Sequence, residues 1–249
     1  MKLDVFMSPT EMVPADTQGR VVAVIDVLRA STTIAVALDN GAKSVIPAES
    51  VDEVITRSKQ FERSQVRLAG ERRMVAIPGF DMGNSPLEFT PEAVAGRTVL
   101  ISTTNGTRAL LSMQAARDIV IASYVNMSAV SAMLRTAARS DLDISIVCAG
   151  AEGHFSLEDA ACAGRYVSSI LERAGSSIVT NDAALACAVI DRKYGDNIEE
   201  IFKDSSHGKA LEEAGFGDDL VACAALDSHP VVAIYQERQI TRLGPDRER

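Results

Sequence analysis

The chain has 249 residues, a hydrophobic fraction of 47% and a formal net charge of −9. This length fits one large α/β domain or two small ones, and it is ample for a buried core. The negative charge argues against nucleic acid as a partner, because such proteins present a basic face and no basic run here is longer than Arg72–Arg73.

No stretch approaches the roughly 20 apolar residues that span a bilayer, and the amino terminus lacks the apolar segment of a secretory signal. We therefore expect a cytoplasmic protein without membrane contact. The four cysteines lie in apolar, alanine-rich surroundings and match no zinc spacing, which indicates reduced core thiols. They are Cys148, Cys162, Cys187 and Cys223.

Three segments repeat one order of patterns. Val21–Ala48 begins with an apolar run, breaks into a small polar loop, continues as a short helix and ends in a second apolar run. Thr98–Ser123 repeats this order, and a looser copy begins at Asp143. Such strand-loop-helix-strand units build parallel sheets. The sequence therefore predicts an α/β fold around mostly parallel sheet.

Between the first two units, the apolar spacing predicts a helix over Val51–Glu62 and a strand near Gln65–Ala69. After Ile178 the chain turns largely helical, and it ends with an apolar run and a charged tail. No linker divides the chain, so we expect a single domain over residues 1–249. The C-terminal segments predicted are helices at Asp182–Tyr194, Asn197–Lys203 and Lys209–Glu213 and the apolar run Pro230–Tyr235.

The loop after the first apolar run carries the first candidate site. Asp26 stands at the carboxyl end of a predicted strand, where ligands of open α/β sheets bind and a carboxylate can hold Mg²⁺. Arg29 can grip a phosphate with two parallel hydrogen bonds, and Ser31 and Thr32 lie at a helix N-terminus suited to anions. The alternative makes Ser31 a helix cap and Arg29 a surface charge.

The second unit carries a related loop, Ser102–Arg108. Its hydroxyls, Asn105 and Gly106 precede a helix that Thr107 opens, which again suits an oxyanion. A capped helix after a tight turn is the alternative. Because two related loops on neighbouring strands can face one ligand, the repetition favours a shared binding site.

Two further segments carry candidate residues. One is the glycine-rich stretch from Gly70 to Phe89; the other leads from Cys148 into a helix whose first turn holds Glu158 and Asp159. Their ordinary interpretations are a surface connection and acidic residues favoured by the helix dipole. The functional interpretation makes one carboxylate a metal ligand or general base. We interpret His207 and His229 as structural or surface residues.

Taken in order, VIDVLRAST, GERR…IPGFDMGNSPLEF, STTNGTRAL and CAGAEGHFSLEDAACAG resemble the 2-phosphosulfolactate phosphatase (ComB-like) family. SSHGKALEEAGFGDDLVACAALD also fits that family, and the match runs from about Leu3 to Ile240. The resemblance implies a ComB-like α/β fold that forms homo-oligomers, with a dimer expected. It also implies Mg²⁺-dependent hydrolysis of phosphosulfolactate, a step toward coenzyme M.

We expect direct attack by a metal-activated water without a covalent intermediate. The predicted catalytic residues are Asp26, Arg29, Asn105 and Glu158, and the predicted metal ligands are Asp26, Glu71 and Asp159, with Glu158 as a further choice. The predicted substrate-binding residues are Ser31, Thr32, Arg72, Asn84, Ser85, Thr104, Gly106, Thr107 and Arg108. A covalent route through Asp26 or Cys148, a different small phosphorylated acid as substrate, and a non-catalytic binder of organic anions stay open as alternatives.

Overall fold

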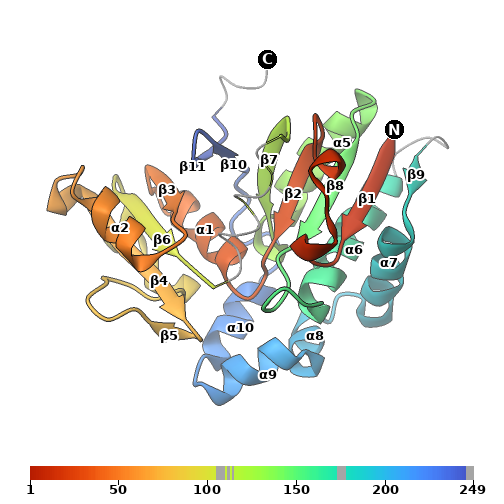
Figure 1. Cartoon of the computed structure of the whole chain (residues 1–249). Helices are drawn as coiled ribbons and strands as arrows, with labels where there is room; N and C mark the ends of the chain where they lie inside the picture. Colours follow the sequence, from red (N-terminus) through yellow and green to blue (C-terminus); the bar gives the residue numbers. More distant parts are fainter. Residues whose placement is uncertain (105–109, 111–112, 114, 173–177, 245–249) are drawn as a thin grey trace.

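The computed structural model describes residues 1–104, 110, 113, 115–172 and 178–244. Within them, eleven strands form one mostly parallel sheet in the order β5-β4-β6-β3-β11-β10-β7-β2-β8-β1-β9 (Figure 1), which confirms the predicted α/β class. The strands are β1 (Lys2–Phe6), β2 (Val21–Ile25), β3 (Ser44–Pro47), β4 (Val66–Arg72), β5 (Val75–Ala76), β6 (Thr98–Ser102), β7 (Asp118–Ala122), β8 (Ile144–Cys148), β9 (Val179–Thr180), β10 (Ala233–Gln236) and β11 (Gln239–Arg242).

Helices cover both faces of this sheet, and the last three helices lie across the carboxyl ends of its strands (Figure 1). The α-helices are α1 (Ala30–Asp39), α2 (Val51–Ser58), α3 (Pro91–Val94), α5 (Met127–Arg139), α6 (Leu157–Leu171), α7 (Asp182–Tyr194), α8 (Ile198–Asp204), α9 (Ser206–Glu213) and α10 (Gly217–Ala224). The 3-10 segments are Pro9–Glu11, Pro14–Asp16, Arg63–Gln65, Pro86–Glu88 and Tyr124–Asn126.

The first two repeat units exchange strands within the sheet. β2 and β3 belong to the first unit, and β6 and β7 belong to the second. β2 pairs in parallel with β7, and β3 pairs in parallel with β6. The hairpin of β10 and β11 bridges the two pairs through antiparallel contacts. The loops after β2 and β6 are therefore not on neighbouring strands, contrary to our expectation from the repeat.

Both faces of the central strands are buried, which explains their continuous apolar runs. On β2, Ala23 and Ile25 pack into the cluster covered by α5, α6 and α7, whereas Val22 and Val24 pack into the cluster that contains α1. α1 is buried along nearly its whole length because strands from both halves of the sheet surround it. This helix therefore holds the loop that begins at Asp26 in a fixed place.

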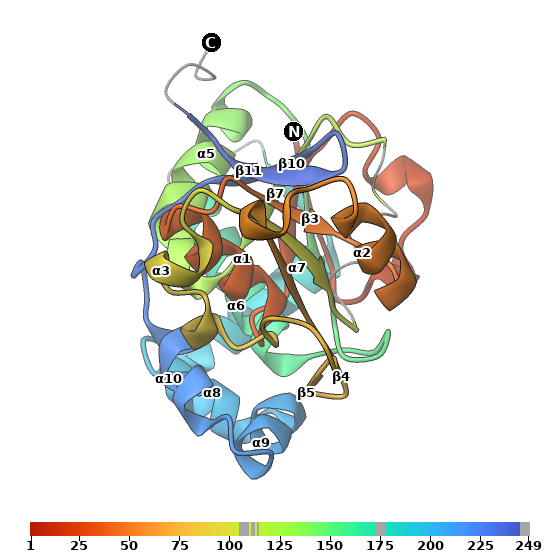
Figure 2. The same cartoon turned by 90° about the vertical axis from the view of Figure 1, so that its left-hand side faces the viewer.

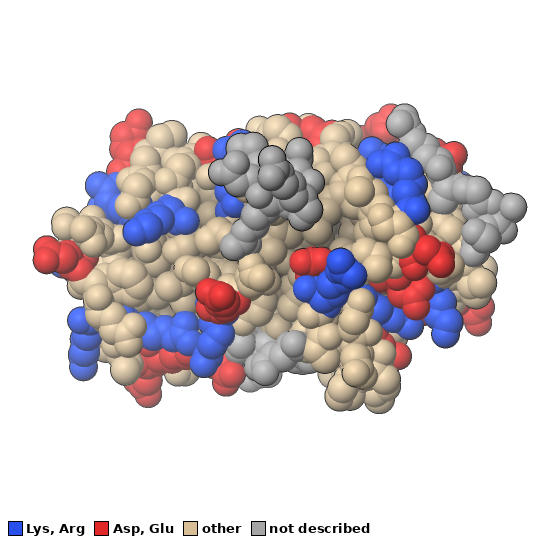
Figure 3. Space-filling model, turned by 90° about the horizontal axis from the view of Figure 1, so that it is seen from above, with Lys and Arg blue, Asp and Glu red and all other residues tan. Residues whose placement is uncertain are grey.

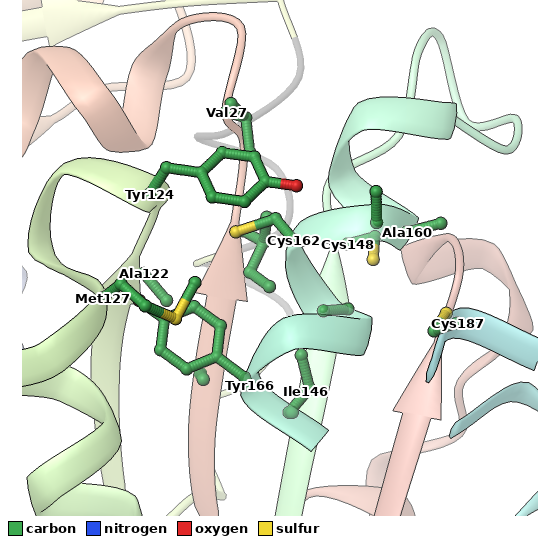
Figure 4. Packing of buried hydrophobic residues seen from close by; sticks show 14 of the residues in the cluster. Val27, Ala122, Tyr124, Met127, Ile146, Cys148, Ala160, Cys162, Tyr166 and Cys187 are labelled. Carbon is green, nitrogen blue, oxygen red and sulfur yellow. The ribbon is translucent and has the colours of Figure 1, made fainter. Parts of the chain in front are cut away.

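The cysteines are free and buried, as predicted. Cys148 on β8, Cys162 on α6 and Cys187 on α7 belong to one hydrophobic cluster (Figure 4). Burial raises the pKa of the Cys148 and Cys162 thiols well above the ordinary range. A thiol that stays protonated and has no exposed surface is a poor nucleophile. The geometry therefore disfavours a covalent route through Cys148.

The helices α8, α9 and α10 lie across the carboxyl ends of the strands, at the bottom of the molecule in Figures 1 and 2. The predicted helix Asp182–Tyr194 has its predicted bounds, whereas α9 begins three residues before the predicted Lys209. Ser205 explains this earlier start, because its hydroxyl accepts the Gly208 N–H as an N-cap. α10 was not predicted, and α2 ends at Ser58 instead of Glu62.

The opposite side of the molecule carries basic and acidic side chains that are mixed with each other (Figure 3). This face therefore offers no continuous basic surface for a nucleic acid. Within the described ranges, no helix combines the length and hydropathy of a membrane-spanning segment. The cytoplasmic location and the homo-oligomer stay predictions.

The close packing of α6 against α7 gives a first test. A Cβ atom added at Gly164 would lie 2.0 Å from the Cys187 carbonyl oxygen, so the two helices would have to move apart. We expect Gly164→Ala to lower the free energy of unfolding by about 1–3 kcal/mol, measured by urea denaturation. Gly217→Ala is the control, because a Cβ there meets no atom within 4 Å. Equal stability of the two variants would contradict this packing.

Candidate active site

A cavity of about 560 Å³ lies between the carboxyl ends of the strands and helix α9. It is open enough to admit a small metabolite. Asp26 and Arg29 reach it from the first repeat unit, whereas Thr103 and Thr104 reach it from the second. The two loops therefore share one cavity although their strands are not neighbours. The remaining lining residues are Leu28, Glu71, Arg73, Met74, Asn84, Ala151, Glu152, His154, Ser206, His207 and Ala210.

Asp26 is the buried carboxylate at the end of β2. Its backbone N–H donates to Ser31 Oγ at 2.9 Å, and its Oδ1 accepts the Ala30 N–H at 3.3 Å. Burial raises the pKa of Asp26 to about 6, and the carboxylates of Glu71 and Glu158 contribute in the same direction, whereas the charge of His207 opposes them. Burial therefore disfavours the ionised form of Asp26, and a positive charge nearby stabilises it.

Arg29 is tied to the C-terminal helices. Its Nη1 lies 2.6 Å from Asp219 Oδ2, and both side chains are almost completely buried. Ser85 donates its hydroxyl to the other Asp219 oxygen at 2.6 Å, and the Arg29 guanidinium stacks 4.3 Å from the centre of the Phe216 ring. Arg29 lines the cavity as predicted, but much of its bonding capacity holds α10 against the loop after β2. Ser85 helps to hold Asp219 of α10 in this contact, and it is not among the lining residues of the cavity.

Glu71 and Arg72 join β4 to the loop after β6. Glu71 Oε1 accepts both the backbone N–H and the hydroxyl of Thr104, and Oε2 accepts the Met74 N–H. Arg72 donates to the Ser102 carbonyl and hydroxyl. Arg72 is not among the lining residues of the cavity, whereas its neighbour Arg73 is.

Glu158 and Asp159 begin α6 and have different partners. Asp159 accepts the Val27 N–H at 2.9 Å and the Gly150 N–H at 3.1 Å, one on each oxygen, so it ties the loops after β2 and β8 together. Gly150 permits this arrangement, because it has φ +68° and a Cβ there would lie 2.2 Å from the His154 carbonyl oxygen. Asp159 as a metal ligand stays a prediction, and its hydrogen bonds favour a structural role.

Glu158 pairs with His207, whose Nδ1 lies 3.3 Å from Glu158 Oε1. Burial alone would raise the pKa of Glu158, but the hydrogen bond and charge of His207 lower it overall. In turn, burial disfavours the charged imidazole, yet the hydrogen bond and charge of Glu158 raise the pKa of His207. The two groups therefore stabilise each other as an ion pair.

Asn84 carries the clearest unmet need in the cavity wall. The residue is buried, and within the described part of the chain its side-chain oxygen has no hydrogen-bond donor. Asp26 and Asn84 line the same cavity, and Mg²⁺ takes oxygen ligands, often one or two carboxylates, and completes its shell with water and substrate phosphate. Asp26 and Asn84 therefore fit this ion. No cluster of three or more acidic, histidine or cysteine ligands occurs among the described residues.

Comparison with known proteins identifies the family of this chain. A family model described as 2-phosphosulpholactate phosphatase matches residues 6–238. The chain belongs to this phosphatase family. It is 43% identical over 228 residues to a probable 2-phosphosulfolactate phosphatase of Symbiobacterium thermophilum, covering 90% of this chain and 95% of that protein. It is 40% identical to a protein of the same description from Caldanaerobacter subterraneus, covering 87% and 88% of the two chains, and 38% identical to one from a Synechococcus species, covering 98% and 100%.

Within this family fold, the predicted site residues divide into three groups. Asp26, Arg29, Glu71, Asn84 and Thr104 line the cavity. Ser31, Thr32, Arg72, Ser85, Glu158 and Asp159 do not line it and hold the surrounding loops and helices through hydrogen bonds. Asn105, Gly106, Thr107 and Arg108 lie outside the described residues.

The hydroxyls of Ser31 and Thr32 show why the anion-site prediction does not fit them. Ser31 Oγ accepts the Asp26 N–H, and Thr32 Oγ1 donates to the Val27 carbonyl oxygen. Both are internal contacts of the loop after β2. Our interpretation of His207 was also incomplete, because its side chain reaches the cavity.

The ion pair of Arg29 and Asp219 gives a second test. Asp219→Asn would leave the Arg29 charge buried without its partner, so we expect a loss of about 3–5 kcal/mol in the free energy of unfolding. Asp218→Asn is the matched control, because Asp218 precedes Asp219 in the same helical turn and is exposed. Thermal and urea unfolding measure both variants. If the two substitutions cost the same, the ion pair does not secure α10.

Proposed function

We propose that this chain is a Mg²⁺-dependent phosphatase that hydrolyses 2-phosphosulfolactate to sulfolactate and phosphate. The observation that carries the proposal is the cavity of about 560 Å³ that Asp26 and Asn84 both line, in a chain of this phosphatase family. When bound, Mg²⁺ would neutralise charge on the phosphoryl group and lower the pKa of the attacking water. Asp26 and Asn84 are the residues that would hold it.

The cationic side chains of the cavity suit the rest of this substrate, which carries a carboxylate and a sulfonate beside its phosphate. Arg29 and Arg73 reach the cavity from two different segments, and the imidazole of His154 can donate a hydrogen bond there. A guanidinium can bind a carboxylate, sulfonate or phosphate through two parallel hydrogen bonds, which fixes orientation as well as charge. These groups would hold the organic anion while its phosphate lies beside Asp26.

Phosphate release tests this function directly. We expect the protein to release phosphate from 2-phosphosulfolactate with Mg²⁺ and to stop when the ion is chelated. Asp26→Asn should lower kcat by about 10²-fold or more, because charge stabilisation at the phosphoryl group is lost. Asp52→Asn, at an exposed position on α2, is the control.

A panel of other phosphorylated three- and four-carbon acids separates the alternatives. If phosphate is released from one of these acids but not from phosphosulfolactate, that acid is the substrate in place of phosphosulfolactate. Tight binding without release from any acid would instead indicate a binding protein. If Asp26→Asn keeps full Mg²⁺-dependent turnover, Asp26 is not the metal ligand.

The raised pKa of Asp26 predicts a stability effect with a definite sign. The carboxyl group titrates near 3.8 when unfolded and at about 6 in the fold, so its contribution to stability is fully present below pH 4 and is lost as the pH rises through 6. In the presence of chelator at pH 8, the free energy of unfolding of Asp26→Asn should therefore exceed that of wild type by about 3 kcal/mol. Its melting temperature should be higher as well. At pH 4 the difference should vanish. A variant that is less stable than wild type at pH 8 would contradict the burial cost of this charge.

A further inference from the structure

The structure brings His207 to the cavity from a segment that sequence patterns did not connect with the site. His207 is the second residue of α9, the helix that crosses the carboxyl ends of the strands (Figure 1). Its side chain is 24% exposed and lines the same cavity as Asp26, together with Ser206 and Ala210. Ser205 caps α9 and fixes where this helix begins. The imidazole is therefore held beside the site and open to it.

The contact with Glu158 sets the orientation of the ring. Glu158 is the nearly inaccessible member of the pair, and its Oε1 lies 3.3 Å from His207 Nδ1. Nδ1 can carry a hydrogen bond to this carboxylate only if it is protonated. The other ring nitrogen, Nε2, is then the one that can exchange a proton with a ligand. A carboxylate that orients and charges an imidazole in this way prepares it as a proton donor.

Hydrolysis of an alkyl phosphate needs such a donor. The leaving group is an alcohol, whose oxygen would carry a full negative charge if it departed unprotonated. Arg29 and Arg73 also line the cavity, but guanidinium groups are too basic to give up a proton readily. His154 lines it as well, yet no carboxylate partner of its imidazole occurs among the described residues. The histidine of the cavity that the described residues show paired with a buried acid is His207.

We propose that His207 is the general acid of the hydrolysis and that Glu158 is the residue that positions it. This inference rests on the proposed phosphatase function. As water oxygen bonds to phosphorus, the bond from phosphorus to the ester oxygen breaks and its electron pair stays on that oxygen. The ester oxygen takes the proton of His207 Nε2 and leaves as the alcohol. The water releases one proton to solvent, and His207 takes up one proton from solvent before the next turnover.

Leaving-group dependence tests the proposal. Phosphate release is measured for a series of monoesters from alkyl to enol and aryl esters, including 2-phospholactate, phosphoenolpyruvate and p-nitrophenyl phosphate. His207→Gln should lower kcat for the alkyl esters by about 10²–10⁴-fold with little change in KM. The loss should shrink steadily as the leaving group becomes more acidic, because such groups depart without a proton. His207→Asn is the second variant should the first fail to fold.

Three further variants separate a chemical role from a structural one. Glu158→Gln should show the same leaving-group pattern with a smaller loss, and it should lower the pKa of His207 in an NMR titration. His154→Gln should change KM without changing the leaving-group dependence. His229→Gln is the control, because this half-buried imidazole is not among the lining residues of the cavity and its Nδ1 contacts the adjacent Ser228 hydroxyl.

The outcomes distinguish this proposal from the function on which it rests. An equal loss of kcat for all esters in the His207 variants would overturn the general-acid role, since a structural defect ignores the leaving group. Unchanged alkyl ester turnover would overturn it too. If wild type releases phosphate neither from phosphosulfolactate nor from any ester of the series, the proposed phosphatase function itself is wrong.

Discussion

The concentration of buried negative charge at the end of the sheet is the constraint on which the site depends. Asp26, Glu71, Glu158 and Asp159 are all buried in this region. A buried carboxylate is costly unless hydrogen bonds or positive charge compensate it. Glu71 accepts N–H and hydroxyl donors of the neighbouring loops, and Glu158 is paired with His207. Asp159 accepts two N–H groups, but burial and the charges of Glu158 and Asp26 still raise its pKa well above the ordinary value. Asp26 lines the cavity with its pKa raised to about 6, so it is the buried carboxylate of the cavity wall that the proposed cation would stabilise.

The same constraint explains why the C-terminal helices belong to the site. Without α10 the guanidinium of Arg29 would be buried without its carboxylate, and without α9 the carboxylate of Glu158 would lack its imidazole. Arg29 and Asp219 are 190 residues apart in the chain. The site is therefore assembled only when the first strand units and the last helices have both folded. Conversely, each ion pair ties one of the C-terminal helices to the segments around the cavity, so the charges that shape the site also hold these helices across it.

The sequence predicted the elements better than their pairing. Apolar runs located β2, β3, β6 and β8, because strands buried on both faces leave a continuous signal. The exchange of strands between the repeat units depends on long-range hydrogen bonds, which no local pattern carries. His207 was missed for a related reason: it lies in a polar helix whose periodicity says nothing about a partner 49 positions earlier. The sequence offered one signal for His207 and Asp219: both lie in the run SSHGKALEEAGFGDDL, which is part of the C-terminal segment that fits the family.

Satisfaction of hydrogen bonds separates structural residues from ligand-binding ones better than residue type does. Ser31, Thr32 and Arg72 have the chemistry of an anion site, but their polar atoms already bind backbone or hydroxyl groups of the fold. Asn84 and Asp26 have unmet needs in the described structure, and both lie on the cavity. Evolution retains an unsatisfied buried group only where something else offsets its cost. The cation site that we propose therefore rests on Asp26 and Asn84, the cavity residues whose buried polar groups the fold leaves least satisfied among those described.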